Sequence, residues 1–243
     1  MRHQLPNAAH EEHSPDLSQI GELHKGAGSD SPIERINAHS GSDAWGEIDS
    51  IEYLTRALSL SSRIGYALPP ISHETHRGRI LCCPFATARV LDVLPDLRLT
   101  SDFSHWVIKT ERMLDTPLEV MLLRQKVAPC VEHLHARIGT PQAPQVISVL
   151  PNALTTRAAQ RFYEWWEDVW DAQWAASRPS VVTATVEYGP PEMDRVTGQI
   201  LPGSYTPVDA CGQPVSGQHL EVTLQAASSA LRSRFKKWRA TAC

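Results

Sequence analysis

Short strand-like segments in this sequence end in acidic or histidine side chains, and helix-like segments separate them. The strand-like segments are Ile36–His39, Ala67–Ser72, Leu97–Asp102, Val131–His135 and Ser180–Val186. Strands that alternate with helices predict βα units and a parallel sheet, because a parallel connection needs a crossover. The carboxyl ends of parallel strands meet on one rim, where enzymes built on such sheets assemble their active sites. The sequence therefore predicts an α/β protein with a polar site on that rim.

The segments between the strands have helical patterns. We expect helices at Ile48–Ile64, Phe85–Leu94, Leu118–Val127, Ala158–Ala176 and Leu220–Trp238, and a short one at Leu17–Leu23. The helix at Ala158–Ala176 repeats its aromatic residues at helical spacing, which predicts one buried face. We interpret its tryptophans as packing residues of an outer layer and not as a stacking platform for a ligand.

Composition limits the classes of function. A chain of 243 residues, 42% of them hydrophobic and 21% charged, can bury a substantial core. The net charge of −4 provides no basic footprint, so we do not expect nucleic acid as a partner. The chain has no apolar run of about 18 residues and no signal-peptide core, so we expect a cytoplasmic protein without a membrane partner. The 5 cysteines form no CxxC pair, which favours reduced thiols.

The chain divides into two segments of different composition. Residues 1–31 are polar and rich in His, Ser, Gly and Asp, and we expect this N-terminal segment to be loosely ordered. Residues 32–243 contain all the strand-like segments and form the expected domain. The histidines of the N-terminal segment are too irregularly spaced to predict a metal site. They are His3, His10, His13 and His24.

Four polar residues at the strand ends form what we call the candidate metal centre. They are Glu74, Asp102, His135 and Glu187. Carboxylate oxygens together with an imidazole nitrogen suit Mn²⁺, Mg²⁺, Co²⁺ or Zn²⁺. A bound divalent ion can polarise a carbonyl and its neighbouring hydroxyl, which acidifies the C–H between them. Two glutamates can then remove a proton and return it elsewhere, as aldose–ketose isomerisation or epimerisation requires.

A single glutamate at a strand end is usually a solvated surface residue, but four such residues on one rim favour a shared site. His133 is an open alternative to His135 as the imidazole ligand, because alternate residues of a strand point to the same side. We favour His135, which lies nearer to the end of the strand.

The strand ends also carry longer motifs. They are Ile36-Asn-Ala-His-Ser-Gly41, His73-Glu-Thr-His-Arg-Gly-Arg79, Leu99-Thr-Ser-Asp-Phe-Ser-His-Trp106, His133-Leu-His-Ala-Arg-Ile-Gly139 and Thr185-Val-Glu-Tyr-Gly-Pro190. In this order, between about Ile33 and Pro207, they resemble the xylose isomerase-like TIM-barrel sugar phosphate isomerases and epimerases. The second and third motifs are long and specific. The Trp165-Trp166 pair of the flanking helix is also similar to that family.

The resemblance implies roles for the candidate metal centre. Glu74 and Glu187 would each be a metal ligand and an acid/base catalyst. Asp102 and His135 would complete the ligand set of a divalent ion, namely Mn²⁺, Mg²⁺, Co²⁺ or Zn²⁺.

The resemblance also implies a set of substrate-binding residues. They are His39, His105, Arg137, His76 and Arg79. Arg137 would lie near the oxygens or the phosphate of the substrate, and His39 would line the pocket. His105 has an alternative role as an additional metal ligand. For His76, Arg79 and the neighbouring Arg77, a basic surface rim without substrate contact stays open.

The sequence departs from the family pattern at several points. Val186 stands where the family usually has proline, and Gly203-Ser204-Tyr205 replaces a tighter Pro-Tyr run. In the family the matching strands are the last five of about eight. Only 35 residues precede Ile36, whereas one βαβ unit takes about 30. We therefore expect an incomplete TIM-type barrel with about five βα units and without its N-terminal strands.

These features lead to one expected function and two alternatives. The expectation is a divalent-metal-dependent isomerase or epimerase of carbohydrate metabolism that acts on a sugar or sugar phosphate, with a homo-oligomer left open. The first alternative is a catalytically inactive barrel fragment or an assembly partner, since an unclosed sheet exposes its edges. The second is a metal-dependent phosphodiesterase resembling AP endonucleases. It would need further ligands, for which His39 and His105 are the candidates, and a basic groove that the net charge does not favour.

Overall fold

The fold is given by a computed structural model of the chain. The structure describes residues 34–64, 69–146, 153–176, 182–189, 194–199 and 218–242. The expected loosely ordered segment 1–31, its short helix at Leu17–Leu23 and the Gly203-Ser204-Tyr205 run lie outside the described residues.

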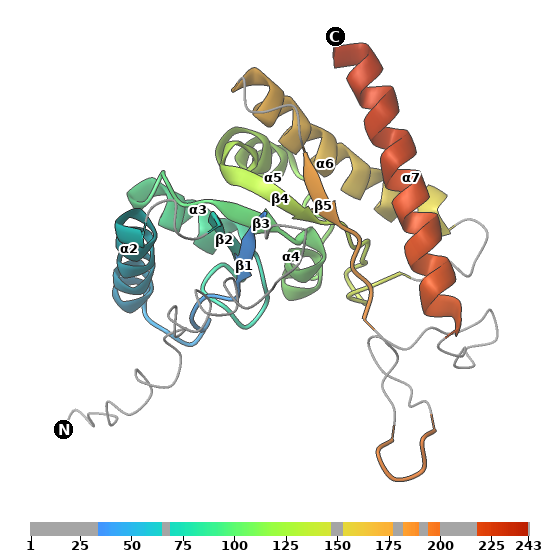
Figure 1. The fold of residues 1–243 in the computed structure, drawn as a ribbon, viewed down its shortest axis with the longest axis horizontal. Coiled ribbons are helices and arrows are strands. Elements are labelled where there is room, and N and C mark those ends of the chain that lie inside the picture. The colour runs from blue at the N-terminus through green and yellow to red at the C-terminus, as the bar shows by residue number, and fades with distance from the viewer. Residues whose placement is uncertain are drawn as a thin grey trace.

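The described strands form one parallel sheet. They are β1 (Ile36–Ala38), β2 (Ile71–Glu74), β3 (Leu99–Ser101), β4 (Val131–His135) and β5 (Thr183–Thr185). Their spatial order is β1-β2-β3-β4-β5, and each neighbouring pair is parallel (Figure 1). Strands of a (β/α) barrel follow one another in this way, because each crossover helix returns the chain to the next position in the sheet. The predicted α/β class is confirmed, and so is the arrangement expected of an incomplete barrel.

The helices alternate with the strands. They are α2 (Glu47–Ile64), α3 (Pro84–Val93), α4 (Phe103–Thr110), α5 (Pro117–Leu122), α6 (Arg157–Ala175) and α7 (Gln218–Ala242), with a π-helical turn at Leu123–Val127 after α5 and short 3₁₀ turns at Ala128–Cys130 and Ala153–Thr155. The helix predicted at Ala158–Ala176 is confirmed almost residue for residue. The helix predicted at Leu118–Val127 begins at Pro117 with a capping box, in which Thr116 and Glu119 satisfy each other's backbone N–H groups.

Two local predictions differ from the structure. The strand predicted at Ala67–Ser72 is found at Ile71–Glu74, because Pro69 and Pro70 have no N–H to donate to a sheet. Helix α4 was not predicted. It starts directly after β3 because the Asp102 carboxylate accepts a hydrogen bond from the N–H of Ser104 at 2.9 Å and caps the first turn.

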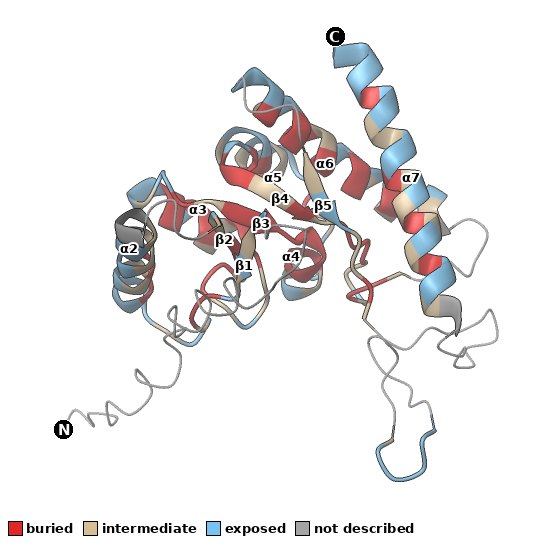
Figure 2. Cartoon of the chain, in the orientation of Figure 1, coloured by how far each residue is buried: buried red, intermediate tan, exposed pale blue. Residues whose placement is uncertain are grey.

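The core lies between the sheet and its helices, and the aromatic face of α6 is a large part of it. Phe162, Trp165, Trp166 and Trp170 are all buried, and Figure 2 shows buried residues along α6. Helix α6 also contacts α7, where Trp170 and Trp238 lie 5.5 Å apart between ring centroids. The interpretation of this helix as outer-layer packing is therefore confirmed. Among the helices that the structure describes, none is long and apolar enough to cross a membrane.

Trp106 of α4 packs in the hydrophobic core, and its replacement tests this packing. Its indole is fully buried and donates to the carbonyl oxygen of Leu81 at 2.8 Å. Trp106→Ala should lower the free energy of unfolding by about 3–5 kcal/mol through the cavity and the lost hydrogen bond. Trp174→Ala is the matched control, because Trp174 is 45% exposed on α6; we expect a loss of about 1 kcal/mol or less there. Urea unfolding measures both, and equal losses would contradict the assignment of Trp106 to the core.

Candidate metal centre

The four residues of the candidate metal centre come from four different strands and meet at one rim of the sheet. Glu74 ends β2, Asp102 follows β3, His135 ends β4 and Glu187 follows β5. One ligand atom from each lies within 4.8 Å of the others. Because parallel strands all present their carboxyl ends on the same side, residues far apart in sequence converge there.

Glu74 is the most enclosed acceptor of the group. Its side chain is only 2% exposed, and Oε2 accepts hydrogen bonds from Asn37 Nδ2 and from His39 Nε2, the latter at 2.8 Å. Nδ1 of His135 lies 3.4 Å from the same oxygen. Burial alone would raise the pKa of Glu74, but these donors and the charge of His135 outweigh it and hold the pKa well below its usual range. Glu74 is therefore ionised at neutral pH.

Asp102 is held rigidly by the start of α4 and by β2. Its Oδ1 accepts from the N–H and the hydroxyl of Ser104, at 2.9 and 2.6 Å. Thr75 accepts from the Asp102 N–H at 2.8 Å and donates to its carbonyl oxygen at 3.1 Å. Complete burial raises the pKa of Asp102 to about 6 against the opposing effect of Arg137. The carboxylate is thus mostly ionised at neutral pH but not far from protonation.

His135 and Glu187 form a close ion pair. Nδ1 of His135 lies 2.7 Å from Glu187 Oε2. Burial would lower the pKa of His135, yet its contacts with Glu187 and Glu74 prevail and raise the pKa to about 10. For Glu187, burial is likewise outweighed by His135 and Arg137, so its pKa is lowered. The Glu187 side chain is 34% exposed, more than the side chains of Glu74, Asp102 and His135.

His133 and His135, which the sequence left as alternative imidazole ligands, have different partners in the structure. Both ring nitrogens of His133 lie on hydroxyl groups of β5, Nδ1 at 2.8 Å from Thr183 and Nε2 at 3.0 Å from Thr185. Only His135 belongs to the group of converging ligand atoms among the described residues.

Arg137 is buried inside the candidate metal centre. Its side chain is 2% exposed, and its guanidinium contacts Asp102 Oδ2 at 2.5 Å and Glu187 Oε1 at 2.9 Å. The same group donates to the Ser104 hydroxyl at 2.8 Å and to His105 Nε2 at 2.6 Å. A planar guanidinium suits such multiple contacts with carboxylates. In this conformation Arg137 contacts two of the ligand carboxylates. Its expected contact with the oxygens or the phosphate of a substrate stays a prediction.

His105, proposed from the sequence as a substrate-binding or additional metal-binding residue, is buried beside the centre. It accepts from Arg137 through Nε2, so its proton is on Nδ1, which has no hydrogen-bond partner among the described residues. Burial, reinforced by Arg137, lowers the pKa of His105 to about 2, and the ring is neutral. Its ring lies 3.7 Å from that of His76 between centroids.

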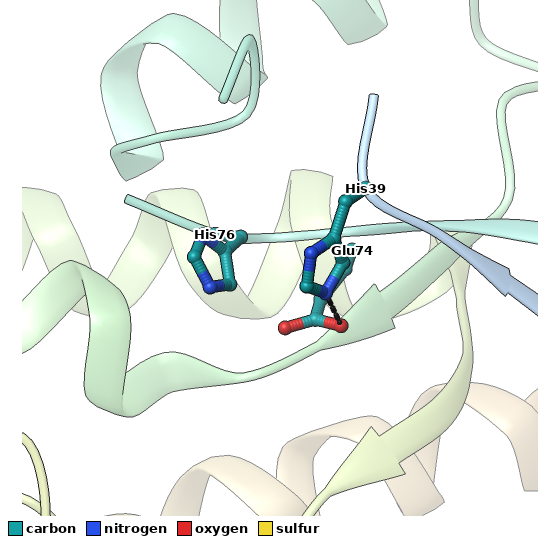
Figure 3. Close-up of side chains that lie close together, drawn as sticks. All are labelled: His39, Glu74 and His76. Carbon is teal, nitrogen blue, oxygen red and sulfur yellow. Dashed lines mark hydrogen bonds and ion pairs between the residues drawn. The ribbon is translucent and has the colours of Figure 1, made fainter. Parts of the chain in front are cut away.

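His39 follows β1 and His76 follows β2, and Figure 3 shows both rings near the Glu74 carboxylate, with the hydrogen bond coming from His39. Burial lowers the pKa of His76, and its Nδ1 lies 2.5 Å from the carbonyl oxygen of Arg77. Arg79, another expected substrate contact, donates instead to the carbonyl oxygen of Gly41 at 3.2 Å and joins the loops after β1 and β2. Gly41 has φ of +60°, and a Cβ there would lie 2.4 Å from the Ile80 side chain, so glycine is required at this junction.

Several supporting residues were not identified from the sequence. Asn37 contacts Glu74, while Thr75 and Ser104 position Asp102. Each lies inside one of the strand-end motifs, and this position was a signal that the residue could belong to the site. The partners of Asn37 and Thr75 come from other strands and could not be assigned from spacing, whereas Ser104 lies two residues after Asp102, the spacing of a helix N-cap.

The donor set fits a divalent cation. Neighbouring ligands of an octahedral ion at about 2.1 Å lie about 3.0 Å apart, and His135 Nδ1 is 2.7 Å from Glu187 and 3.4 Å from Glu74. The three carboxylates are opposed by Arg137 and protonated His135, which leaves one net negative charge. Replacing the His135 proton with a divalent ion would make the group neutral, so the balance of charge favours such an ion.

No protein-family profile and no curated protein matches the sequence. Among solved structures, the chain is similar to the probable 3-DHS dehydratase AsbF involved in petrobactin synthesis from Bacillus anthracis, with a TM-score of 0.41 and 17% sequence identity. The match covers 70% of this chain and 61% of that one, so this chain spans about three fifths of the length of the structure it matches.

Proposed function

We propose that this protein is a divalent-metal-dependent isomerase or epimerase that acts on a sugar or sugar phosphate. The observation that carries the proposal is the convergence of three carboxylates and one imidazole from four strand ends within 4.8 Å. The motifs that resemble sugar phosphate isomerases and epimerases lie on the same strand ends.

Glu74, Asp102, His135 and Glu187 would hold the metal ion through side-chain oxygens and the Nδ1 nitrogen. When bound, the ion supplies Lewis-acid polarisation of the substrate carbonyl and its neighbouring hydroxyl. Mn²⁺, Mg²⁺, Co²⁺ and Zn²⁺ all remain candidates, because carboxylate ligands suit the first two and the imidazole suits the others.

In this proposal Glu74 and Glu187 move the proton. Both carboxyl groups have lowered pKa values, so each is ionised and can accept a proton from carbon. Glu74 is enclosed by Asn37 and His39, which fix its carboxylate, whereas Glu187 is partly exposed and can exchange protons with solvent. Arg137 holds Glu187 in place through Oε1 and leaves Oε2 directed at the centre.

The polar residues around the centre suit an oxygen-rich substrate. His39 and His76 lie beside Glu74 with ring N–H groups and lone pairs that match sugar hydroxyls. Arg79, which joins the loops after β1 and β2, adds positive charge that favours a phosphate. We keep His39, His76, His105, Arg79 and Arg137 as proposed substrate-binding residues.

Removal of the partly exposed acid/base tests the proton transfer. Glu187→Gln should lower kcat for isomerisation by about 10²–10⁴-fold, because an amide cannot accept the proton. Turnover of a panel of aldoses, ketoses and their phosphates, together with exchange of substrate C–H for solvent deuterium, measures the effect. Glu164→Gln is the control, since Glu164 lies exposed on α6. Full activity in Glu187→Gln would refute the two-glutamate mechanism; no turnover by the native, metal-loaded protein would favour the non-catalytic alternative.

Metal binding should release a proton. Because the pKa of His135 is raised to about 10, its imidazole is protonated at pH 7.5 and must lose that proton to become a ligand. Each Mn²⁺ bound should then release about one proton, and the affinity should rise about tenfold per pH unit between about pH 6.5 and 9. Below about pH 6 protonation of Asp102 should steepen the dependence. Calorimetry in buffers of different ionisation enthalpy measures the protons; binding without proton release would exclude His135 as a ligand.

The metal-free protein should lose stability as the pH rises. The folded-state pKa of His135, about 10, lies above the value of about 6.5 in the unfolded chain, so the folded state binds the proton more tightly. The contribution is fully present below about pH 6.5 and is lost as the pH approaches 10. Urea unfolding in EDTA across this range should show the decline in the native protein and a flatter profile in His135→Gln. Identical profiles would show that His135 is not the titrating group.

A further inference from the structure

Gln145 lies in the loop after β4, and its side chain pairs with the backbone beyond β5. The residue is only 4% exposed. Its Nε2 donates to the carbonyl oxygen of Gly189 at 3.0 Å, and its Oε1 accepts from the N–H of the same residue at 2.8 Å. A carboxamide offers a donor and an acceptor side by side, so it satisfies both backbone groups of Gly189 at once.

We propose that Gln145 is a positioning residue that holds Glu187 in the candidate metal centre through the backbone of Gly189. The inference rests on the proposed function, in which Glu187 is both a metal ligand and an acid/base catalyst. Gln145 itself is not among the converging ligand atoms of the described residues, so its role is to place another side chain and not to bind the ion.

The backbone that carries Glu187 is anchored on both sides. Before it, the carbonyl oxygen of Thr185 accepts from the Ala136 N–H at 2.7 Å, which ties the end of β5 to the end of β4. Strand β5 ends at Thr185, so the sheet no longer fixes the chain where Glu187 stands. The next anchor is the pair of hydrogen bonds between Gln145 and Gly189, two residues beyond Glu187.

The loop that carries Gln145 is closed by its own backbone. Thr140 and Ala143 exchange two backbone hydrogen bonds, at 2.8 and 3.2 Å. The Val146 N–H, next to Gln145, donates to the carbonyl oxygen of Ile138 at 2.7 Å and closes the base of the loop. A residue can orient another group only if its own support is fixed, and this loop provides that support.

The contacts of Glu187 explain why its backbone must be held. Its Oε2 lies 2.7 Å from His135 Nδ1 and its Oε1 lies 2.9 Å from Arg137, while the side chain is 34% exposed. Functional groups must stay within about 0.5 Å of their productive geometry. A partly exposed side chain at the edge of the sheet depends on its backbone for that precision, and Gln145 supplies the second of the two anchors.

Gln145→Met tests the inference, because methionine has a similar length and volume but cannot form the pair of hydrogen bonds. The dissociation constant of Mn²⁺, measured by electron paramagnetic resonance, should rise about 10–100-fold. The spectrum of the bound ion should shift toward that of Glu187→Gln. In the Glu187→Gln background the same replacement should change the constant by less than about twofold, because Gln145 acts through Glu187. Gln142→Met is the matched control, since Gln142 lies exposed in the same loop and should keep the native constant.

The results for this inference and for the proposed function can differ. An unchanged Mn²⁺ affinity in Gln145→Met, or an equal loss in both backgrounds, would overturn the positioning role and leave the proposed function standing. If the native protein binds no Mn²⁺, the proposed function is contradicted, and urea unfolding in EDTA decides the inference. Gln145→Met should then lower the unfolding midpoint more in the native background than in Glu187→Gln, and equal shifts would overturn it. Gln145→Asn, whose shorter amide cannot reach both groups of Gly189, takes the place of Gln145→Met if that variant does not fold.

Discussion

The arrangement of this site depends on buried positive charge. Glu74, Asp102 and Glu187 arrive at one rim from separate strands, and unpaired carboxylates at such separations would repel one another strongly in a medium of low dielectric constant. The guanidinium of Arg137 contacts Asp102 and Glu187. The protonated imidazole of His135 lies close to Glu74 and Glu187. Buried charges persist only when they are paired and hydrogen-bonded, so these two cations permit the carboxylates to be brought together at all.

The same contacts connect the chemistry of the site to the backbone. Arg137 donates to the Ser104 hydroxyl, and Ser104 in turn donates to Asp102, which caps α4. Thr75, at the end of β2, holds the backbone of Asp102 on both its N–H and its carbonyl side. A side chain held by a helix cap and a strand end has few alternative rotamers. The acceptors are therefore directed in advance of any ion, which reduces the cost of ordering them on binding.

Whether a feature could be predicted from the sequence depended largely on whether neighbouring or distant residues determine it. The strands β1, β3 and β4, though not all their exact ends, and the long helix α6 could be predicted, because alternation and helical periodicity are local patterns. The start of α4 was missed although its cap lies within the sequence motif around Asp102. The displacement of β2 past Pro69 and Pro70 was also locally encoded and was misjudged. The burial of Arg137 could not be predicted, because a lone arginine after a strand is ordinarily exposed.

The sequence by itself determined which residue types stand at the ends of parallel strands, and hence that carboxylates and histidines share one rim. Only the tertiary structure decided how they pair: that Arg137 faces Asp102 and Glu187, that His135 and not His133 joins the group, and that Glu74 also meets His39 and His76. The physical reason is that strand alternation sets the side to which a residue points, whereas side-chain contacts depend on the register between strands. That register is fixed by packing across the whole sheet.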